Sequence, residues 1–439
     1  MTITNAPAEA DDRQTVTPQA RTALWASLVG TTIEWYDFFL YATAASLVFN
    51  QAFFPDQTTF VGTLLSFATF AVGFLVRPIG GFVFGHVGDR IGRKKTLALT
   101  MLLMGGATAL MGVLPTAAQI GVLAPILLLL LRIVQGFALG GEWAGAVLLA
   151  VEHSPPRKRG LFGSVPQVGL ALGLALGTGV FALLQIALPD EAFLTYGWRI
   201  AFLFSIVLVI FGVVVRLKAS ETPAFEKVRD SNDRATVPLR EVFRPPFLKS
   251  TVLGMLSRWG EGAAFNTWGV FAISYATGAL KLEKVPVLVA VTIAALLMAA
   301  LLPVSGLLTD RYGAKRVYAT GIAAYGVAVF PVFALFGTKD IVLYTVAMVL
   351  VFGVVHAVFY GAQGTLYASL YPARVRYTGL STVYQLSGVY ASGLTPLILT
   401  ALIGAAGGSP WIACGYLVAT AIISVIATLA LKPTPLQQL

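Results

Sequence analysis

The sequence predicts an all-α membrane protein in which twelve transmembrane helices form two six-helix bundles related by an internal repeat. The first observation is composition: 57% of the 439 residues are hydrophobic and only 11% are charged, whereas a soluble domain carries roughly 25% charged residues. The second is a succession of apolar runs, each long enough to cross a bilayer core about 30 Å thick. The third is a polar loop motif that occurs once in each half of the chain.

The apolar runs fall into two sets of six, separated by the longest polar stretch of the chain. We predict spans at residues 22–49, 58–86, 95–114, 119–151, 160–188, 198–216, 249–277, 285–309, 315–336, 340–370, 376–404 and 409–431. The predicted organisation is a cytoplasmic N-terminal tail at 1–21, a first bundle at 22–216, a central cytoplasmic loop at 217–248, a second bundle at 249–431 and a short cytoplasmic tail at 432–439.

The basic residues predict the topology. Of the 30 Lys and Arg residues, 23 lie in predicted cytoplasmic segments, three in outer loops and four within spans. This bias places both termini in the cytoplasm. We therefore assign the net charge of +10 to topology in a lipid bilayer, and expect no nucleic-acid partner. The polar start of the chain lacks the basic region and cleavage site of a signal peptide, and the single Cys414 allows no intramolecular disulfide.

A loop motif repeats at equivalent places in the two halves. "GHVGDRIGRKK" at 85–95 follows the second span, and "GLLTDRYGAKR" at 306–316 follows the eighth. A constant offset pairs Gly85 with Gly306, Asp89 with Asp310, Arg90 with Arg311 and Gly92 with Gly313, whereas Arg93 is matched by Ala314. Repeated halves are typical of secondary transporters, whose substrate site lies near the midplane between them.

The loop motif resembles the signature of the major facilitator superfamily. "IEWYDFFLYATAASLVF", "FATFAVGFLVRPIGG", "RIVQGFALGGEWAGA", "YGWRIAFLFS" and "ETPAF" resemble its metabolite:proton symporter family. That family includes carriers of shikimate, oxoglutarate, citrate, and proline or betaine. The resemblance covers nearly all of the first half and is looser in the second. It implies the major facilitator fold. It also implies that the protein lies in a plasma membrane of the bacterial inner-membrane type.

The resemblance also implies that the repeated loops form a charge latch between the halves. Asp89 would cap or pair with a neighbouring helix, and Arg93 would contact Glu152 at the end of the fourth span. The predicted gating residues are Gly85, Asp89, Arg90, Gly92, Arg93, Glu152, Asp310 and Arg311. The alternative is that these basic loops only set the topology.

Two acidic residues lie deep in the first span. Glu34 and Asp37 are three residues apart, so they share a helix face with Tyr41. A charge at the bilayer centre costs about 2.5–3.5 kcal/mol on insertion scales, and two neighbouring carboxylates repel one another. We predict that one of them binds and releases a proton. The alternative is that each carboxylate pairs with an arginine and holds helices together.

Two arginines within spans are the predicted binding groups for a substrate anion. A guanidinium in a dry cavity binds a carboxylate through two parallel hydrogen bonds, a geometry that lysine lacks. Arg77 lies in the second span, and Arg132 shares a predicted polar stripe with Gln135 and Glu142 in the fourth. We expect Gln135, Glu142 and Tyr41 to line the same substrate cavity. The alternative is an internal Arg–Glu pair without a ligand role.

The second half offers further polar residues for the substrate site. Arg258 and Glu261 are three apart and can pair along one helix. The unperturbed pKa of histidine, about 6.5, would suit His356 for proton traffic, although a histidine in a helix contact is the commoner case. The other predicted cavity residues are Asn266, Tyr360, Gln363 and the similarly placed Gln167 and Gln385.

These residues predict a carrier driven by an ion gradient. The sequence contains no Walker A loop, no Cys/His ligand cluster and no reactive constellation of an enzyme, so we expect no cofactor, no metal and no catalytic activity. The predicted function is the import of a small organic acid with protons by alternating access. Shikimate-like, keto- or dicarboxylate and aromatic acids all fit.

Two alternatives remain open. A proton symporter of zwitterionic osmolytes is the close rival, disfavoured because the chain lacks a long C-terminal coiled-coil extension. A passive facilitator or channel is the rival from another class. The oligomeric state is open, and a monomer is compatible with the sequence.

Overall fold

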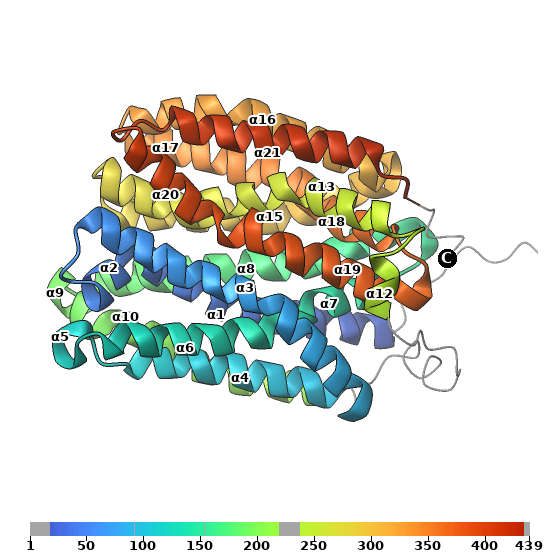
Figure 1. The fold of residues 1–439 in the computed structure, drawn as a ribbon, viewed down its shortest axis with the longest axis horizontal. Coiled ribbons are helices and arrows are strands. Elements are labelled where there is room, and N and C mark those ends of the chain that lie inside the picture. Colours follow the sequence, from blue (N-terminus) through green and yellow to red (C-terminus); the bar gives the residue numbers. More distant parts are fainter. Residues whose placement is uncertain (1–17, 92, 153, 219–237, 434–439) are drawn as a thin grey trace, which may run out of the picture.

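The computed structural model describes residues 18–91, 93–152, 154–218 and 238–433, and within these ranges it contains helices and connecting turns. The helices run roughly parallel to the long axis of the molecule, with the first half of the chain on one side and the second half on the other (Figure 1). Helices dominate because a bilayer offers no partner to backbone N–H and C=O groups.

The first half comprises six long helical rods with short connecting elements. Its elements are α1 (Pro18–Leu47), α2 (Phe49–Phe53), α3 (Thr59–Ile91), α4 (Arg93–Val113), α5 (Ala117–Ile120), α6 (Leu123–Ala138), η1 (Leu139–Gly141), α7 (Glu142–Glu152), η2 (Pro156–Lys158), α8 (Arg159–Ala187), α9 (Asp190–Ala192), η3 (Phe193–Gly197) and α10 (Trp198–Lys218).

The second half repeats this arrangement, with π-helical turns inside several rods. Its elements are α12 (Pro238–Val242), α13 (Leu248–Asn266), η4 (Thr267–Phe271), α14 (Ala272–Ser274), η5 (Tyr275–Ala279), α15 (Lys284–Tyr312), α16 (Ala314–Gly337), α17 (Ile341–Met348), η6 (Val349–Val355), α18 (His356–Ala368), α19 (Ala373–Ser387), η7 (Gly388–Gly393), α20 (Thr395–Ala405) and α21 (Trp411–Ala430).

The twelve predicted spans correspond in order to these rods. Nine described helices are long and apolar enough to cross a membrane. The other three places are filled by α1, α4 and the rod from α13 to η5. The π-helical turns η4, η6 and η7 directly adjoin Asn266, His356 and Ser387. Such turns are frequent at functional sites because they redirect side chains within a helix.

The halves meet most closely along α8 and α15. A Cβ atom added at Gly306 of α15 would lie 2.7 Å from the Cα atom of Leu161 in α8, so this crossing requires glycine. Beside it, the Asp310 carboxylate accepts hydrogen bonds from the backbone N–H groups of Gly160, at 2.6 Å, and Leu161, at 3.0 Å. Asp310 thus caps the N-terminus of α8, where unsatisfied N–H groups favour a negative charge.

Candidate functional site

Asp37 of α1 is fully buried within the first half. The Ser205 hydroxyl of α10 donates a hydrogen bond to Asp37 Oδ1 at 2.5 Å, and Gln135 of α6 donates to the Asp37 backbone carbonyl at 3.2 Å. Among the described residues, no arginine or lysine forms an ion pair with Asp37. The alternative of a helix-bridging ion pair therefore finds no support at Asp37. Glu34 is also buried, 3% exposed.

Arg132 belongs to the interior of the first half. Its guanidinium donates to the Gln135 side-chain oxygen and, at 3.4 Å, to the backbone oxygen of Phe70. The Gln135 amide in turn donates to Thr108 at 2.8 Å. The hydrogen bond between Arg132 and Gln135 agrees with their predicted shared stripe. These contacts favour a role in supporting α1, and direct contact of Arg132 with substrate stays a prediction.

Glu142 and Tyr41 also form hydrogen bonds within the first half. Glu142 accepts a hydrogen bond from Thr100 of α4. The Tyr41 hydroxyl donates to Thr69 of α3 at 2.7 Å. These two hydrogen bonds join helices of one bundle, and the expectation that Glu142 and Tyr41 line a substrate cavity stays a prediction.

Arg77 of α3 lies among aromatic rings. Its Cζ atom is 4.1 Å from the centroid of the Phe74 ring, 4.2 Å from that of Phe38 and 5.3 Å from that of Trp35. The side chain is 3% exposed, and its Nε and Nη2 atoms form no hydrogen bond with the described residues. No ion pair with a carboxylate is found for Arg77 in the described part of the chain. A buried cation with free N–H groups is suited to binding an anion.

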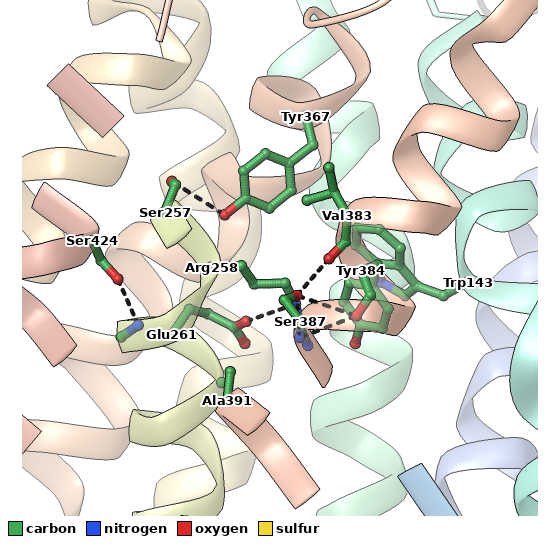
Figure 2. Close-up of polar contacts among 12 residues, drawn as sticks. Trp143, Ser257, Arg258, Glu261, Tyr367, Val383, Tyr384, Ser387, Ala391 and Ser424 are labelled. Atoms are coloured by element: carbon green, nitrogen blue, oxygen red, sulfur yellow. Dashed lines mark hydrogen bonds and ion pairs between the residues drawn. The ribbon is translucent and has the colours of Figure 1, made fainter. Parts of the chain in front are cut away.

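The second half contributes a paired charge. Arg258 and Glu261 of α13 form the ion pair expected from their spacing, with Nε and Oε2 3.3 Å apart. Arg258 also donates to the Tyr384 carbonyl and the Ser387 hydroxyl, each at 3.2 Å (Figure 2). Its Cζ atom lies 3.8 Å from the centroid of the Tyr384 ring. Arg258 therefore has a carboxylate partner and two hydrogen-bond acceptors in its own half, unlike Arg77.

Trp143 and Tyr384 join the two halves. Their rings stack at a centroid distance of 3.7 Å and an interplanar angle of 14° (Figure 2). The Trp143 indole donates to Gln167 of α8 at 3.1 Å, and Gln385 of α19 donates to the Gly140 carbonyl at 2.6 Å. Gln167 thus contacts Trp143, and Gln385 follows Tyr384 in α19; their shared role in a substrate site stays a prediction.

The second half also contributes a group of buried polar side chains to the candidate site. Phe265 of α13 stacks on Phe39 of α1 at 5.2 Å between ring centroids and contacts His356 and Tyr360 at 5.4 and 5.8 Å. Several polar atoms near it form no hydrogen bond within the described chain: both His356 ring nitrogens, the Tyr360 hydroxyl, the Gln363 amide and the Asn266 Oδ1 atom. These groups can receive hydrogen bonds from, or donate them to, a polar ligand. Proton binding at His356 stays a prediction.

The predicted latch is described in part. Glu152 forms an ion pair with Arg376 of α19, at 3.0 Å between oxygen and nitrogen, whereas the resemblance implied Arg93. Arg311 lies over the Tyr312 ring at 5.2 Å, and Asp310 caps α8. Gly92, the surroundings of Gly85 and the side chains of Asp89, Arg90 and Arg93 are not among the described parts of the structure, so their gating roles stay predictions.

We expect loss of the Glu152–Arg376 pair to loosen the contact between halves at this end. Glu152 is about one-third exposed, so the pair contributes about 1 kcal/mol, or about fivefold in the equilibrium. The measurement is the thiol-labelling rate of Thr365→Cys in a Cys414→Ala background, because Thr365 contacts the Arg159 carbonyl across the interface. Glu152→Gln, Arg376→Gln and the double variant should all raise labelling to a similar degree. Additive effects of the single variants would show that the pair is not coupled.

Sequence reasoning missed four residues of this site. Ser205 was the detectable one, because it is a lone hydroxyl in the apolar run "FLFSIVLVIF". Phe38 and Tyr384 gave no signal, since aromatic residues are common throughout the spans. Arg376 is the first residue of the eleventh predicted span and is counted among the basic residues that set the topology. Among the described residues, no group of three His, Cys, Asp or Glu side chains could hold a metal ion.

The fold and the site define a membrane carrier in which two six-helix halves enclose buried charged and aromatic groups. The chain belongs to the Major Facilitator Superfamily, whose model matches residues 27–392. It is a multi-pass membrane transporter and not an enzyme.

Relatives of known description cover almost the whole chain. An inner membrane metabolite transport protein, YhjE, of Escherichia coli strain K12 is 40% identical over 98% of this chain and 98% of its own length. The shikimate transporter of the same organism is 40% identical over 94% of this chain and 95% of its own. The proline/betaine transporter of Escherichia coli strain K12 is 32% identical over 94% of this chain and 84% of its own length. The crystal structure of a D-xylose-proton symporter shares the fold, with a TM-score of 0.74 at 16% identity, over 95% of this chain and 99% of its own.

Proposed function

We propose that this protein is a proton-coupled symporter that imports a small organic acid by alternating access. The observation that carries the proposal is Arg77, a buried cation with free N–H groups and no carboxylate partner among the described residues. A substrate carboxylate would supply the missing anion through paired hydrogen bonds. The Phe74 ring beside Arg77 favours an acid with a flat or cyclic body.

Asp37 is the proposed proton site. It forms no ion pair among the described residues and accepts a hydrogen bond from the Ser205 hydroxyl. Moving a bare carboxylate together with a bound anion through a closed state would be costly. Protonation of Asp37 removes one of those charges, which is the physical reason for coupling. Glu34, one turn away, is the second candidate, and the gradient itself supplies the energy in place of any cofactor.

The proposed cycle uses the two bundles, 22–216 and 249–431, as the moving parts. Binding of proton and acid allows the Trp143–Tyr384 stack and the Glu152–Arg376 pair to part, which opens the site toward the end of the molecule where the described chain begins and ends. The charge bias of the loops places this end in the cytoplasm, in a membrane of the bacterial inner-membrane type. Nothing in this cycle requires a second subunit.

A symporter of zwitterionic osmolytes is the alternative with a specific supporting observation. Aromatic rings bind quaternary ammonium groups. If Arg77 held the carboxylate of a zwitterion, the aromatic rings around Arg77 could bind its ammonium group. The relatives weigh toward the acid, because the shikimate transporter is 40% identical and the proline/betaine transporter 32%. The passive facilitator differs from both in needing no proton site.

The test is substrate exchange in proteoliposomes with a panel of shikimate, oxoglutarate, citrate, benzoate, proline and betaine. We expect one of the acids to exchange and the zwitterions to fail. Exchange of proline or betaine with no exchange of the acids would overturn the assignment in favour of the osmolyte carrier. Arg77→Lys is the matched variant, since exchange through this site must decline when its fork of N–H donors is removed.

A further inference from the structure

One aromatic ring is shared by two buried arginines. The Cζ atoms of Arg77 and Arg132 lie 4.2 and 4.4 Å from the centroid of the Phe38 ring. Phe38 is completely buried. The two guanidiniums come from different helices, α3 and α6, and the ring comes from α1. Each arginine also has a ring of its own, Phe74 for Arg77 at 4.1 Å and Tyr41 for Arg132 at 4.1 Å.

Phe38 is tied to the proposed proton site by the backbone. It directly follows Asp37 in α1, and Gln135 hydrogen-bonds both the Asp37 carbonyl and the Arg132 guanidinium. The groups described against the Asp37 side chain are the Tyr36 phenol of α1, Thr108 of α4 and Ser205 of α10, none of them a cation or a carboxylate. Glu34 lies one turn before Asp37 on the same helix. A shift of this turn of α1 therefore moves the carboxyl group and the shared ring together.

The shared ring responds to the charge on Arg77. Two like charges against one ring repel each other, and the attraction of each to the ring depends on how closely it approaches. An anion on Arg77 neutralises one of the two and leaves Arg132 as the dominant attraction. Substrate binding therefore changes the balance of forces on the Phe38 ring and favours a shift of the ring toward Arg132. Because coupling free energies are reciprocal, a change at Asp37 must alter anion binding at Arg77 by the same factor.

We propose that Phe38 is the positioning residue that couples substrate binding at Arg77 to proton binding at Asp37. The proposal rests on the function proposed above and adds a component to it. Phe38 contacts neither the transferred proton nor the substrate charge. It acts through the two guanidiniums, so its loss should separate exchange of substrate from uphill transport.

The test compares Phe38→Leu, Phe38→Tyr and Phe74→Leu in proteoliposomes, using the panel acid that wild type exchanges fastest. Phe74→Leu is the matched control, because within the described part of the chain the Phe74 ring lies against Arg77 and not against Arg132. Two quantities are measured for each variant: exchange without a pH gradient, and accumulation under a gradient of one pH unit, which supports about tenfold accumulation for one proton per substrate.

For Phe38→Leu we expect exchange within about threefold of wild type and accumulation below about twofold. Phe38→Tyr retains a ring and should keep both activities. Phe74→Leu should raise KM and keep the accumulation ratio. Chromatographic profile and melting temperature report folding, and Phe38→Met replaces the leucine variant if that variant unfolds.

Three results would overturn the inference. They are accumulation by Phe38→Leu at the wild-type level, a parallel loss of exchange and accumulation in a folded Phe38 variant, and uncoupling by Phe74→Leu equal to that by Phe38→Leu. Failure of the proposed function looks different, because wild type itself would then exchange the acid without accumulating it.

Discussion

Asp37→Asn should abolish uphill transport while exchange of substrate continues. A gradient of one pH unit is worth about 1.4 kcal/mol per proton and sustains about tenfold accumulation at one proton per substrate. Asparagine retains the size of Asp37 and can still accept the hydrogen bond from Ser205, which lies 2.5 Å from Oδ1. It cannot bind and release a proton. We therefore expect the accumulation ratio to fall from about ten to about one.

Exchange at equal pH on both sides is the internal control for Asp37→Asn, because exchange requires binding and rocking but no net proton movement. Ser205→Ala is the matched variant: it removes the hydroxyl that donates to Asp37 Oδ1 and leaves the titrating group in place. We expect it to alter the pH at which accumulation is half-maximal while preserving accumulation itself. Full accumulation by Asp37→Asn, with Glu34→Gln inactive, would move the proton site to Glu34. Full accumulation by both variants would remove the proton site from α1.

Arg77→Lys should weaken substrate binding by about 30-fold, equivalent to about 2 kcal/mol. Lysine keeps the charge but presents a compact ammonium in place of a planar fork. It therefore loses one of the two hydrogen bonds to a carboxylate and the flat contact with the Phe38 and Phe74 rings, whose centroids lie 4.2 and 4.1 Å from Cζ. The measurement is the affinity of the exchanged acid by equilibrium binding to purified protein.

Arg199→Lys is the matched control for the arginine prediction. Arg199 also lies in a spanning rod, but it donates to the carbonyls of Gly112 and Leu114 at the end of α4. Its replacement should leave the binding affinity within a factor of about two. Unchanged affinity in Arg77→Lys, or an equal loss in Arg199→Lys, would show that Arg77 does not hold the substrate anion.

The fold was predictable because its signal is local and repeated. Each span is an apolar run long enough for a bilayer, and the loop motif marks corresponding points in the two halves. The pair of Arg258 and Glu261 followed from helical spacing alone, and its ion pair is present in the structure. Spacing likewise joined Arg132 to Gln135. Such contacts depend on one helix, whose geometry the sequence determines.

Contacts between helices were the part that the sequence did not reveal. Tyr384 stacks on Trp143, and Ser205 binds Asp37, although nothing in the local pattern at either position names the partner. The same holds for Glu152, which pairs with Arg376 and thus with the other half. These partners depend on the rotation and depth of each rod. Rotation and depth are set by packing between helices. Neighbouring apolar faces of one helix can pack almost equally well, so the sequence does not show which face meets which partner.

The central claim is that substrate and proton move together, and luminal pH in proteoliposomes tests it most directly. The acid identified by exchange is added outside vesicles that have equal pH on both sides and a clamped membrane potential. The account predicts that the lumen acidifies as the acid enters, that reversing the acid gradient reverses the pH change, and that Asp37→Asn removes it. Entry of the acid down its gradient with no protein-dependent pH change would contradict symport and identify a passive facilitator.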